Sequence, residues 1–450
     1  MGVVRQGMAG RPPTSAESAT ESATTTEADL PVEADEPAEE PAEEPAEETA
    51  DDREPGSATA SGFRAAAHRF GPALALYGAV KLAGFAAFMW LLETSGHYRT
   101  TDPRFGGGVH PWDVLGTWDG LWYEKVAQLG YDPQLIPEQG FFTIKQNSAA
   151  FFPMYPGLIR LVTNTGLGLY GAGMLVSIVA SFVAAAGIFA VVSRLYGHRA
   201  GVIAAGLWAA FPGSGVEWAV YSESVFVALA AWACFFVIDR NWLSAAVVAF
   251  MAGLARPSSV PLIAGVALAA AVALWKRRDG VVGPLTAIVL PPIGCLGYLA
   301  WVGYRMGHLD GYITLQRGGW LHFFDWGRYT LRAATNVLRG ETNYLFAYPT
   351  EDLIAVVVLF SLPILLVSLM SKRPPLVLAV YTLGTLVMVL GSQQMFGTLS
   401  RFVLPIFPLL IPLAVALARV RLRNLATVLG VAALSSGWYA GYVIFQLGIP

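Results

Sequence analysis

The chain has few charged residues and few cysteines for its length. Only 14% of its 450 residues are Asp, Glu, Lys or Arg, and 55% are hydrophobic. Soluble domains usually contain about 25% charged residues, so this composition excludes an ordinary set of soluble domains and indicates several membrane spans. The two cysteines, Cys234 and Cys295, each lie inside an apolar run. A disulfide framework is thereby excluded, and small buried hydrophobic residues are favoured.

The first 60 residues also lack apolar runs, and their charge is one-sided. Residues 1–55 hold sixteen acidic and three basic residues, a net charge of −13, and include the near-repeat EPAEEPAEEPAEE. The other 395 residues hold sixteen acidic and twenty-six basic residues, a net charge of +10. Blocks of like charge with little hydrophobicity cannot offset the entropy of ordering. Residues 1–60 are therefore predicted to be a disordered acidic tail ahead of a transmembrane domain over 61–450.

Apolar runs long enough to cross a bilayer, which takes about 20 residues in a helix, begin near Gly71. A first run of this length predicts a span and not a cleaved signal peptide. The fold expected is an all-α polytopic bundle of eleven transmembrane helices. They are predicted at residues 71–92, 170–193, 200–220, 223–238, 242–255, 258–275, 282–303, 353–371, 375–391, 402–418 and 425–447.

Basic residues predict the orientation of these spans, because they collect at turns that face the cytoplasm. Counting from a cytoplasmic N-terminus places five basic clusters on that side: Arg194 and Arg199, Arg240, Lys276 to Arg278, Lys372 and Arg373, and Arg419 to Arg423. The chain is therefore predicted to be a multi-pass protein of the cell membrane with its C-terminus outside. Two long loops, 93–157 and 304–350, are expected on the external side.

The stretch 118–156 of the first external loop is rich in carboxylates and aromatic rings. It contains Asp119, Glu138 and nine aromatic residues, among them Trp118, Tyr123 and Tyr155. Aromatic faces stack on sugar rings, and a carboxylate can remove a hydroxyl proton. This combination suits sugar chemistry and predicts an active-site loop.

Charged residues near other spans are expected at the same external face. Glu217 and Glu223 flank a short turn, Arg256 follows a span, and Arg401 opens another. A charge in hydrocarbon costs at least about 2.5 kcal/mol, so such residues usually have a function. Four charges on the face that carries Asp119 predict one shared site.

Each of these residues also has a plainer interpretation. Asp119 precedes an amphipathic run, with Trp122, Val126 and Leu129 expected inward, so it also suits a helix N-cap. Glu138 suits a solvated loop, and Tyr221 to Glu223 could simply end a helical hairpin. Arg256 and Arg401 suit contact with lipid headgroups.

The second external loop, 304–350, carries five arginines interleaved with aromatic residues. External arginines run against the usual charge bias. Two interpretations stand side by side. The guanidinium groups bind lipid phosphates, or the segment is an interfacial amphipathic helix.

Five segments together carry a resemblance to a known family. In order they read WDGLWYEKVAQLGYD from Trp118, then Glu138, AFFPMYP from Ala150, FPGSGVEWAVYSESVFVAL from Phe211 and GLARPSS from Gly253. This series resembles the motif order of the PIG-V-type family of GPI mannosyltransferase 2, which includes actinobacterial members. The later LSRFVLPIFP, which contains Arg401, is also similar to a family motif.

The resemblance implies a GT-C glycosyltransferase that uses a polyprenyl-phosphate sugar. The expected reaction moves mannose from polyprenyl-phosphate-mannose to a glycolipid or glycan acceptor at the external face, with inversion. Asp119 is similar to the proposed catalytic carboxylate and is expected to act as general base. The residues expected to bind substrate are Trp118, Tyr123, Glu138, Tyr155, Ser222, Glu223, Arg256 and Arg401.

No cofactor or metal is expected to be obligatory, since Arg256 and Arg401, with an arginine of the 304–350 loop, can stabilise a leaving phosphate. Asp119, Glu138 and Glu223 could together hold one ion if they converge. The expected partners are the bilayer, the sugar donor and the acceptor, with no nucleic acid. A transporter or flippase of lipid-linked glycans is the main alternative, although repeated halves, which are typical of transporters, are not evident. A non-catalytic scaffold for envelope assembly is a third possibility.

Overall fold

A computed structural model describes residues 55–100, 108–133, 145–344, 347–393 and 395–450. The chain divides into the units Met1–Ser57 and Ala58–Pro450, and the second unit is described below. The predicted disordered tail lies, up to residue 54, outside the described residues and stays a prediction there. Its last six predicted residues, 55–60, are instead helical and form the start of α1 (Pro55–Ser95). Glu138 falls in the undescribed stretch 134–144 and also stays a prediction.

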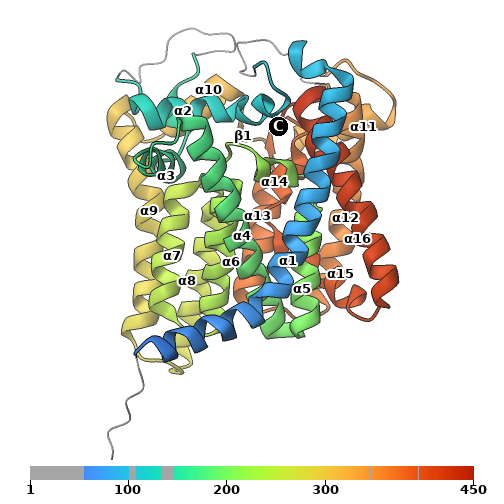
Figure 1. Cartoon of the computed structure of the whole chain (residues 1–450). Helices are drawn as coiled ribbons and strands as arrows, with labels where there is room; N and C mark the ends of the chain where they lie inside the picture. Colours follow the sequence, from blue (N-terminus) through green and yellow to red (C-terminus); the bar gives the residue numbers. More distant parts are fainter. Residues whose placement is uncertain (1–54, 101–107, 134–144, 345–346, 394) are drawn as a thin grey trace, which may run out of the picture. The chain divides into compact units, whose positions relative to one another are not determined.

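The regular secondary structure of the described residues is almost entirely helical (Figure 1). The α-helices are α1 (Pro55–Ser95), α2 (Asp119–Leu129), α3 (Met154–Thr163), α4 (Leu169–Tyr196), α5 (His198–Ala209), α6 (Glu223–Ile238), α7 (Trp242–Ala255), α8 (Val260–Trp275), α9 (Val282–Met306), α10 (Gly311–Trp320), α11 (Arg328–Leu338), α12 (Pro349–Met370), α13 (Leu376–Leu390), α14 (Leu399–Val403), α15 (Ile411–Leu417) and α16 (Leu422–Ser436). Short 3₁₀ segments are η1 (His97–Thr100), η3 (Pro111–Gly116), η4 (Ser148–Ala150), η5 (Ser214–Trp218), η6 (Pro257–Ser259) and η7 (Phe407–Leu410), and a π-helix, η8 (Gly437–Leu447), follows α16.

All eleven ranges predicted to span the membrane contain helix. Among the described residues, six helical segments are long and apolar enough to cross a bilayer. They are Ala67–Ser95, Leu169–Tyr196, Pro257–Trp275, Val282–Met306, Pro349–Met370 and Leu422–Leu447. The prediction of an all-helical, multi-pass membrane protein is confirmed.

Small residues let the long helices pack closely, as is common in membrane bundles. A Cβ on Gly187 of α4 would lie only 2.9 Å from the Cβ of Ala231 on α6. Similarly, a Cβ on Gly253 of α7 would lie 2.8 Å from the backbone nitrogen of Cys295 on α9. Cys234 and Cys295 are both buried free thiols, as predicted.

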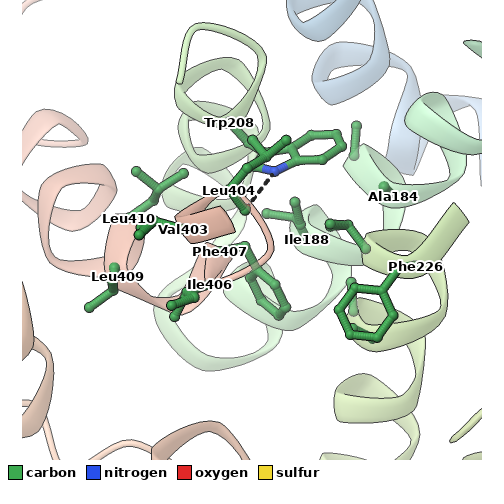
Figure 2. Packing of buried hydrophobic residues seen from close by; sticks show 14 of the residues in the cluster. Ala184, Ile188, Trp208, Phe226, Val403, Leu404, Ile406, Phe407, Leu409 and Leu410 are labelled. Carbon is green, nitrogen blue, oxygen red and sulfur yellow. Dashed lines mark hydrogen bonds between the residues drawn. The ribbon is translucent and has the colours of Figure 1, made fainter. Parts of the chain in front are cut away.

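The predicted span 402–418 is not one continuous helix. It divides into α14, η7 and α15, because Pro405 has no N–H to continue the helical hydrogen bonds of α14. Trp208 of α5 donates its indole N–H to the Leu404 carbonyl at 3.3 Å, just where α14 ends (Figure 2). This contact fixes α14, which carries Arg401, against the bundle core.

A two-stranded ribbon connects the second long loop to the segment before α14. Strand β1 (Phe323–Phe324) pairs antiparallel with β2 (Ser392–Gln393). Figure 1 shows α2 and α10 at the same end of the bundle as the C-terminus. The first and second long loops therefore meet at one end.

Helix α2 confirms the amphipathic helix expected in the first loop, but its buried face differs from the prediction. Tyr123, Val126 and Ala127 are buried, whereas Leu129 is 72% exposed. Val126 is buried as expected, but Tyr123 takes the inward place expected of Trp122 because its ring packs against Phe151 and Tyr155.

Candidate functional site

Arg401 of α14 connects three parts of the chain that are far apart in sequence. Its Nη2 donates to Asp119 Oδ2 at 2.5 Å, and its Nε donates to Glu223 Oε1 at 2.5 Å. Its Nη1 donates to the main-chain oxygen of Pro450 at 2.7 Å. The guanidinium also lies over the Tyr221 ring, 4.5 Å from its centroid. Arg401 therefore uses all three of its nitrogens within the protein.

Glu223, the first residue of α6, joins Arg401 to a second arginine. Its Oε1 also accepts from Nη1 of Arg256 at 2.6 Å. Glu223 Oε2 is buried and has no hydrogen-bond partner among the described residues. Buried charges are tolerated when they are paired and hydrogen-bonded, so one carboxylate oxygen shared by two guanidiniums holds both in place.

Ser222 and Tyr123 extend this cluster toward the first loop. Arg256 Nη1 donates to Ser222 Oγ at 3.2 Å, and the Tyr123 hydroxyl lies 2.7 Å from the same oxygen. Burial raises the pKa of Tyr123. The nearby charge of Arg256 lowers this pKa, whereas the charges of Asp119 and Glu223 raise it, and the net effect is a raised pKa. The phenol therefore stays protonated and available as a hydrogen-bond donor.

The backbone of the first loop docks directly on the turn that carries Ser222 and Glu223. Val220 N donates to the Leu115 carbonyl at 2.9 Å, and the Tyr221 hydroxyl donates to the Thr117 carbonyl at 3.1 Å. Directly after Thr117, Trp118 has a φ of 57°, and a positive φ is unusual for a bulky residue. Such strained residues are found at functional sites where the surroundings hold them in place.

Asp119 is not the helix cap that its position also suggested. Trp118 occupies the cap position of α2, Asp119 is the first helical residue, and no side-chain capping bond is formed. The carboxylate is instead held by Arg401. Among the described residues Asp119 Oδ1 has no hydrogen-bond partner, so this oxygen can accept a proton.

Exposure separates the four charged side chains into two groups. The side chains of Asp119 and Arg256 are 27% and 13% exposed, whereas those of Arg401 and Glu223 are 5% and 1% exposed. Only Asp119 and Arg256 thus combine a charge with some access for a substrate. Arg401 and Glu223 lie behind them.

Two of the sequence-predicted residues take other places. Tyr155 is fully buried, bonds to the Gly173 carbonyl and Ser177 Oγ, and packs edge-on against the Tyr123 ring. Tyr155 therefore packs against Tyr123 and helps to hold its ring in place. Glu217, expected at the shared face, instead pairs with Lys81 at 3.2 Å and accepts from the Tyr77 hydroxyl at 2.5 Å.

His322 lies near the cluster, although sequence analysis did not single it out. Its ring lies 6.1 Å from the ring of Phe402, which follows Arg401. Burial, with a contribution from the nearby Arg256 charge, lowers the pKa of His322 to about 4. The imidazole is therefore neutral at pH 7. A single histidine among aromatic residues, without a second histidine or carboxylate at a recognisable spacing, did not stand out in the sequence.

Among the described residues, no group of three or more His, Cys, Asp or Glu side chains is placed to hold a metal ion. Glu138, one of the three carboxylates that the sequence suggested for such a site, lies outside them. Independence from metals therefore stays a prediction.

No protein-family model matches the sequence, and no curated protein sequence matches it. Among solved structures, the chain is similar to ArnT from Cupriavidus metallidurans bound to undecaprenyl phosphate, with 15% identity and a TM-score of 0.47. It is also similar to an Archaeoglobus fulgidus oligosaccharyltransferase in complex with Zn and sulfate, with 14% identity and a TM-score of 0.43. These alignments cover 78% and 82% of this chain but only 60% and 53% of the other two. Such distant likenesses leave the activity to be argued from the residues of the site.

Proposed function

We propose that the chain is a membrane glycosyltransferase of the GT-C type. It transfers mannose from polyprenyl-phosphate-mannose to a glycolipid or glycan acceptor at the external membrane face. The observation that carries the proposal is the cluster itself: a partly exposed carboxylate, Asp119, beside a partly exposed arginine, Arg256, with Glu223 and Arg401 buried behind them. The choice of mannose rests on the family resemblance of the sequence motifs.

Asp119 acts as the general base in this reaction. A sugar hydroxyl is a weak nucleophile until its proton is being removed. As Asp119 accepts that proton, the acceptor oxygen bonds to the anomeric carbon from the side opposite the phosphate. The bond from the anomeric carbon to the phosphate oxygen breaks, and the configuration inverts. Arg401 holds Oδ2 at 2.5 Å and so directs Oδ1 toward the acceptor.

Arg256 is the better of the two arginines for the leaving phosphate. Only its Nη1 is engaged, by Glu223 and Ser222, and among the described residues its Nε and Nη2 have no acceptor. Those two nitrogens can form the paired hydrogen bonds that guanidinium makes with phosphate. Arg401, with every nitrogen engaged, instead orients Asp119. This narrows the earlier expectation that both arginines bind the phosphate.

A transfer assay tests the proposal directly. Membranes containing the protein are supplied with polyprenyl-phosphate-mannose labelled in the sugar and with an acceptor lipid extract, and label in the glycolipid fraction is measured. Asp119→Asn at equal abundance is expected to lower transfer by about 10²- to 10⁴-fold, as loss of a general base does. Asp113→Asn is the matched control, because Asp113 lies in the same loop but bonds only to the backbone of His110 among the described residues.

Two outcomes contradict the proposal. If Asp119→Asn transfers sugar as fast as the wild-type protein, Asp119 is not the general base. No transfer by the wild-type protein, together with movement of lipid-linked glycan across reconstituted vesicles, would instead support the transporter hypothesis.

A further inference from the structure

Glu351 is a buried carboxylate that the proposed reaction does not use. It lies in the first turn of α12 and is 1% exposed. Burying a carboxylate is costly, and an apolar side chain of similar size would avoid that cost. Its contacts therefore indicate what it does.

The first contact of Glu351 is with the C-terminal segment. Ile449 N donates to Glu351 Oε2 at 3.2 Å. Position 448 is a glycine, and a Cβ there would overlap the same carboxylate oxygen. The segment held in this way places the main-chain oxygen of Pro450 2.7 Å from Arg401 Nη1.

The second contact is with the turn that leads into α14. A Cβ on Gly397 would lie 2.6 Å from both Cδ and Oε2 of Glu351, so the backbone approaches the carboxyl group closely there. Thr398 then occupies the N-cap position of α14, and Arg401 follows three residues later. The Tyr439 hydroxyl completes the connection, 3.4 Å from Ser400 Oγ and 3.5 Å from the Glu351 carbonyl.

Glu351 therefore contacts both segments that set the position of Arg401, one carrying its backbone and one supplying an acceptor for its Nη1. We propose that Glu351 is a positioning residue that fixes Arg401 and, through it, the carboxylate of Asp119. The consequence for catalysis rests on the proposed role of Asp119 as base. The effect on Arg401 and on the C-terminal segment does not.

Kinetics of two substitutions test the catalytic part. Glu351→Gln keeps the size of the side chain and an oxygen acceptor for Ile449 N–H, so it is expected to retain transfer within about threefold, which corresponds to a small geometric change. Glu351→Leu removes the acceptor and is expected to lower kcat by about tenfold to a hundredfold, as misplacement of a catalytic group does. The donor KM is expected to change little, because Arg256 keeps its own partners.

The matched control is Asp352→Asn. Asp352 is equally buried, but its carboxylate bonds to Tyr344 and to the backbone of Tyr348, which belong to the second loop. It is expected to leave the kcat per folded molecule unchanged. An equal loss of kcat in Asp352→Asn and Glu351→Leu, or equal kcat in Glu351→Leu and Glu351→Gln, overturns the proposal.

Hydrogen–deuterium exchange gives a readout that does not need activity. Glu351→Leu is expected to speed exchange of the backbone amides at 396–401 and 448–449, while Glu351→Gln leaves them protected. If these amides respond but no variant transfers sugar, the proposed function fails and the positioning role stands. If exchange rises only in α12, Glu351 merely stabilises its own helix and the inference is wrong.

The glycine at 448 allows an independent check. Gly448→Ala alone is expected to lower kcat about tenfold or more, since a displaced Pro450 oxygen moves Arg401. In a protein that already carries Glu351→Ala, the shorter side chain leaves room for the added methyl group. Adding Gly448→Ala to that protein is therefore expected to lower kcat by less than about twofold. Losses that simply multiply in the double variant contradict the contact.

Discussion

Arg256 and Arg401 differ in how many of their nitrogens the protein already uses, and the proposed function gives them different tasks for this reason. Arg401 donates to Asp119, Glu223 and Pro450. Arg256 donates to Glu223 and to Ser222 from a single nitrogen, Nη1. Arginine can hold several acceptors in a fixed planar fork, whereas a lysine ammonium is a point charge. Replacing each arginine by lysine therefore keeps the charge and removes the geometry.

The two lysine variants are expected to separate in steady-state kinetics of sugar transfer. Arg256→Lys would lose the proposed paired contact with the donor phosphate, so the donor KM should rise about tenfold, as for one charge-assisted hydrogen bond. Arg401→Lys no longer fixes Asp119, so kcat should fall about tenfold to a hundredfold with the donor KM nearly unchanged. Arg339→Lys, an exposed position at the end of α11, is the control. The same kinetic change in both variants would contradict the division of tasks.

At the residue level the sequence predicted membership of the site better than it predicted contacts. Scarcity of charge in apolar surroundings singled out Glu223 and Arg401, and the acidic, aromatic composition of the first loop singled out Asp119. The structure brings these three side chains together. The same reasoning included Glu217, which instead pairs with Lys81. Sequence reasoning could not pair Glu217 with Lys81, which lies in the middle of the first predicted span. Two opposite charges that are 136 residues apart leave no local sequence pattern.

Helix α2 contains a titratable residue whose charge the fold disfavours. Glu124 is half-buried beside Gly116, and burial raises its pKa to about 6. An acid with a raised pKa in the folded state binds its proton more tightly there than in the unfolded chain. The stability of the folded protein therefore falls as pH rises from about 4.5 to about 6 and then levels off.

Glu124→Gln removes this charge and is expected to raise the melting temperature at pH 7.5. Near pH 4.5 the wild-type side chain is protonated in the folded protein, so the two proteins are expected to melt at the same temperature. Thermal unfolding of both proteins in detergent, measured across this range, checks the prediction. A difference in melting temperature that is the same at every pH would show that the carboxylate charge is not its cause.

The length of each apolar run was sufficient to predict that a helix is present, but not that the helix is unbroken. Each of the eleven expected ranges contains helix, since a bilayer requires the same length wherever a span occurs. Breaks depend on single residues inside those runs. Pro405 divides the range 402–418, and α5 ends at Ala209, shortly before Pro212 in the range 200–220. Hydropathy averaged over 20 residues does not reveal such breaks. The prolines that cause them can be read in the sequence.

At the scale of the whole molecule, the arrangement of the helices relates the site to the predicted topology. Helix α9 leads from the turn containing Arg278 to the segment before α10, which lies at the same end of the bundle as α2 (Figure 1). Its 25 residues extend about 38 Å, enough to cross the hydrocarbon core. Arg278 and the candidate site therefore lie at opposite ends of the bundle. If basic turns face the cytoplasm, the site faces outward.

Cysteine labelling in intact cells tests this orientation. The two native thiols, Cys234 and Cys295, are buried, so the wild-type protein is expected to remain unlabelled by a membrane-impermeant maleimide. Arg339→Cys, exposed at the end of α11, is expected to react in intact cells. Arg278→Cys, exposed in the α8–α9 turn, is expected to react only after the membrane is permeabilised. The reverse pattern would place Asp119 and Arg256 on the cytoplasmic side, where a donor presented at the external face could not reach them.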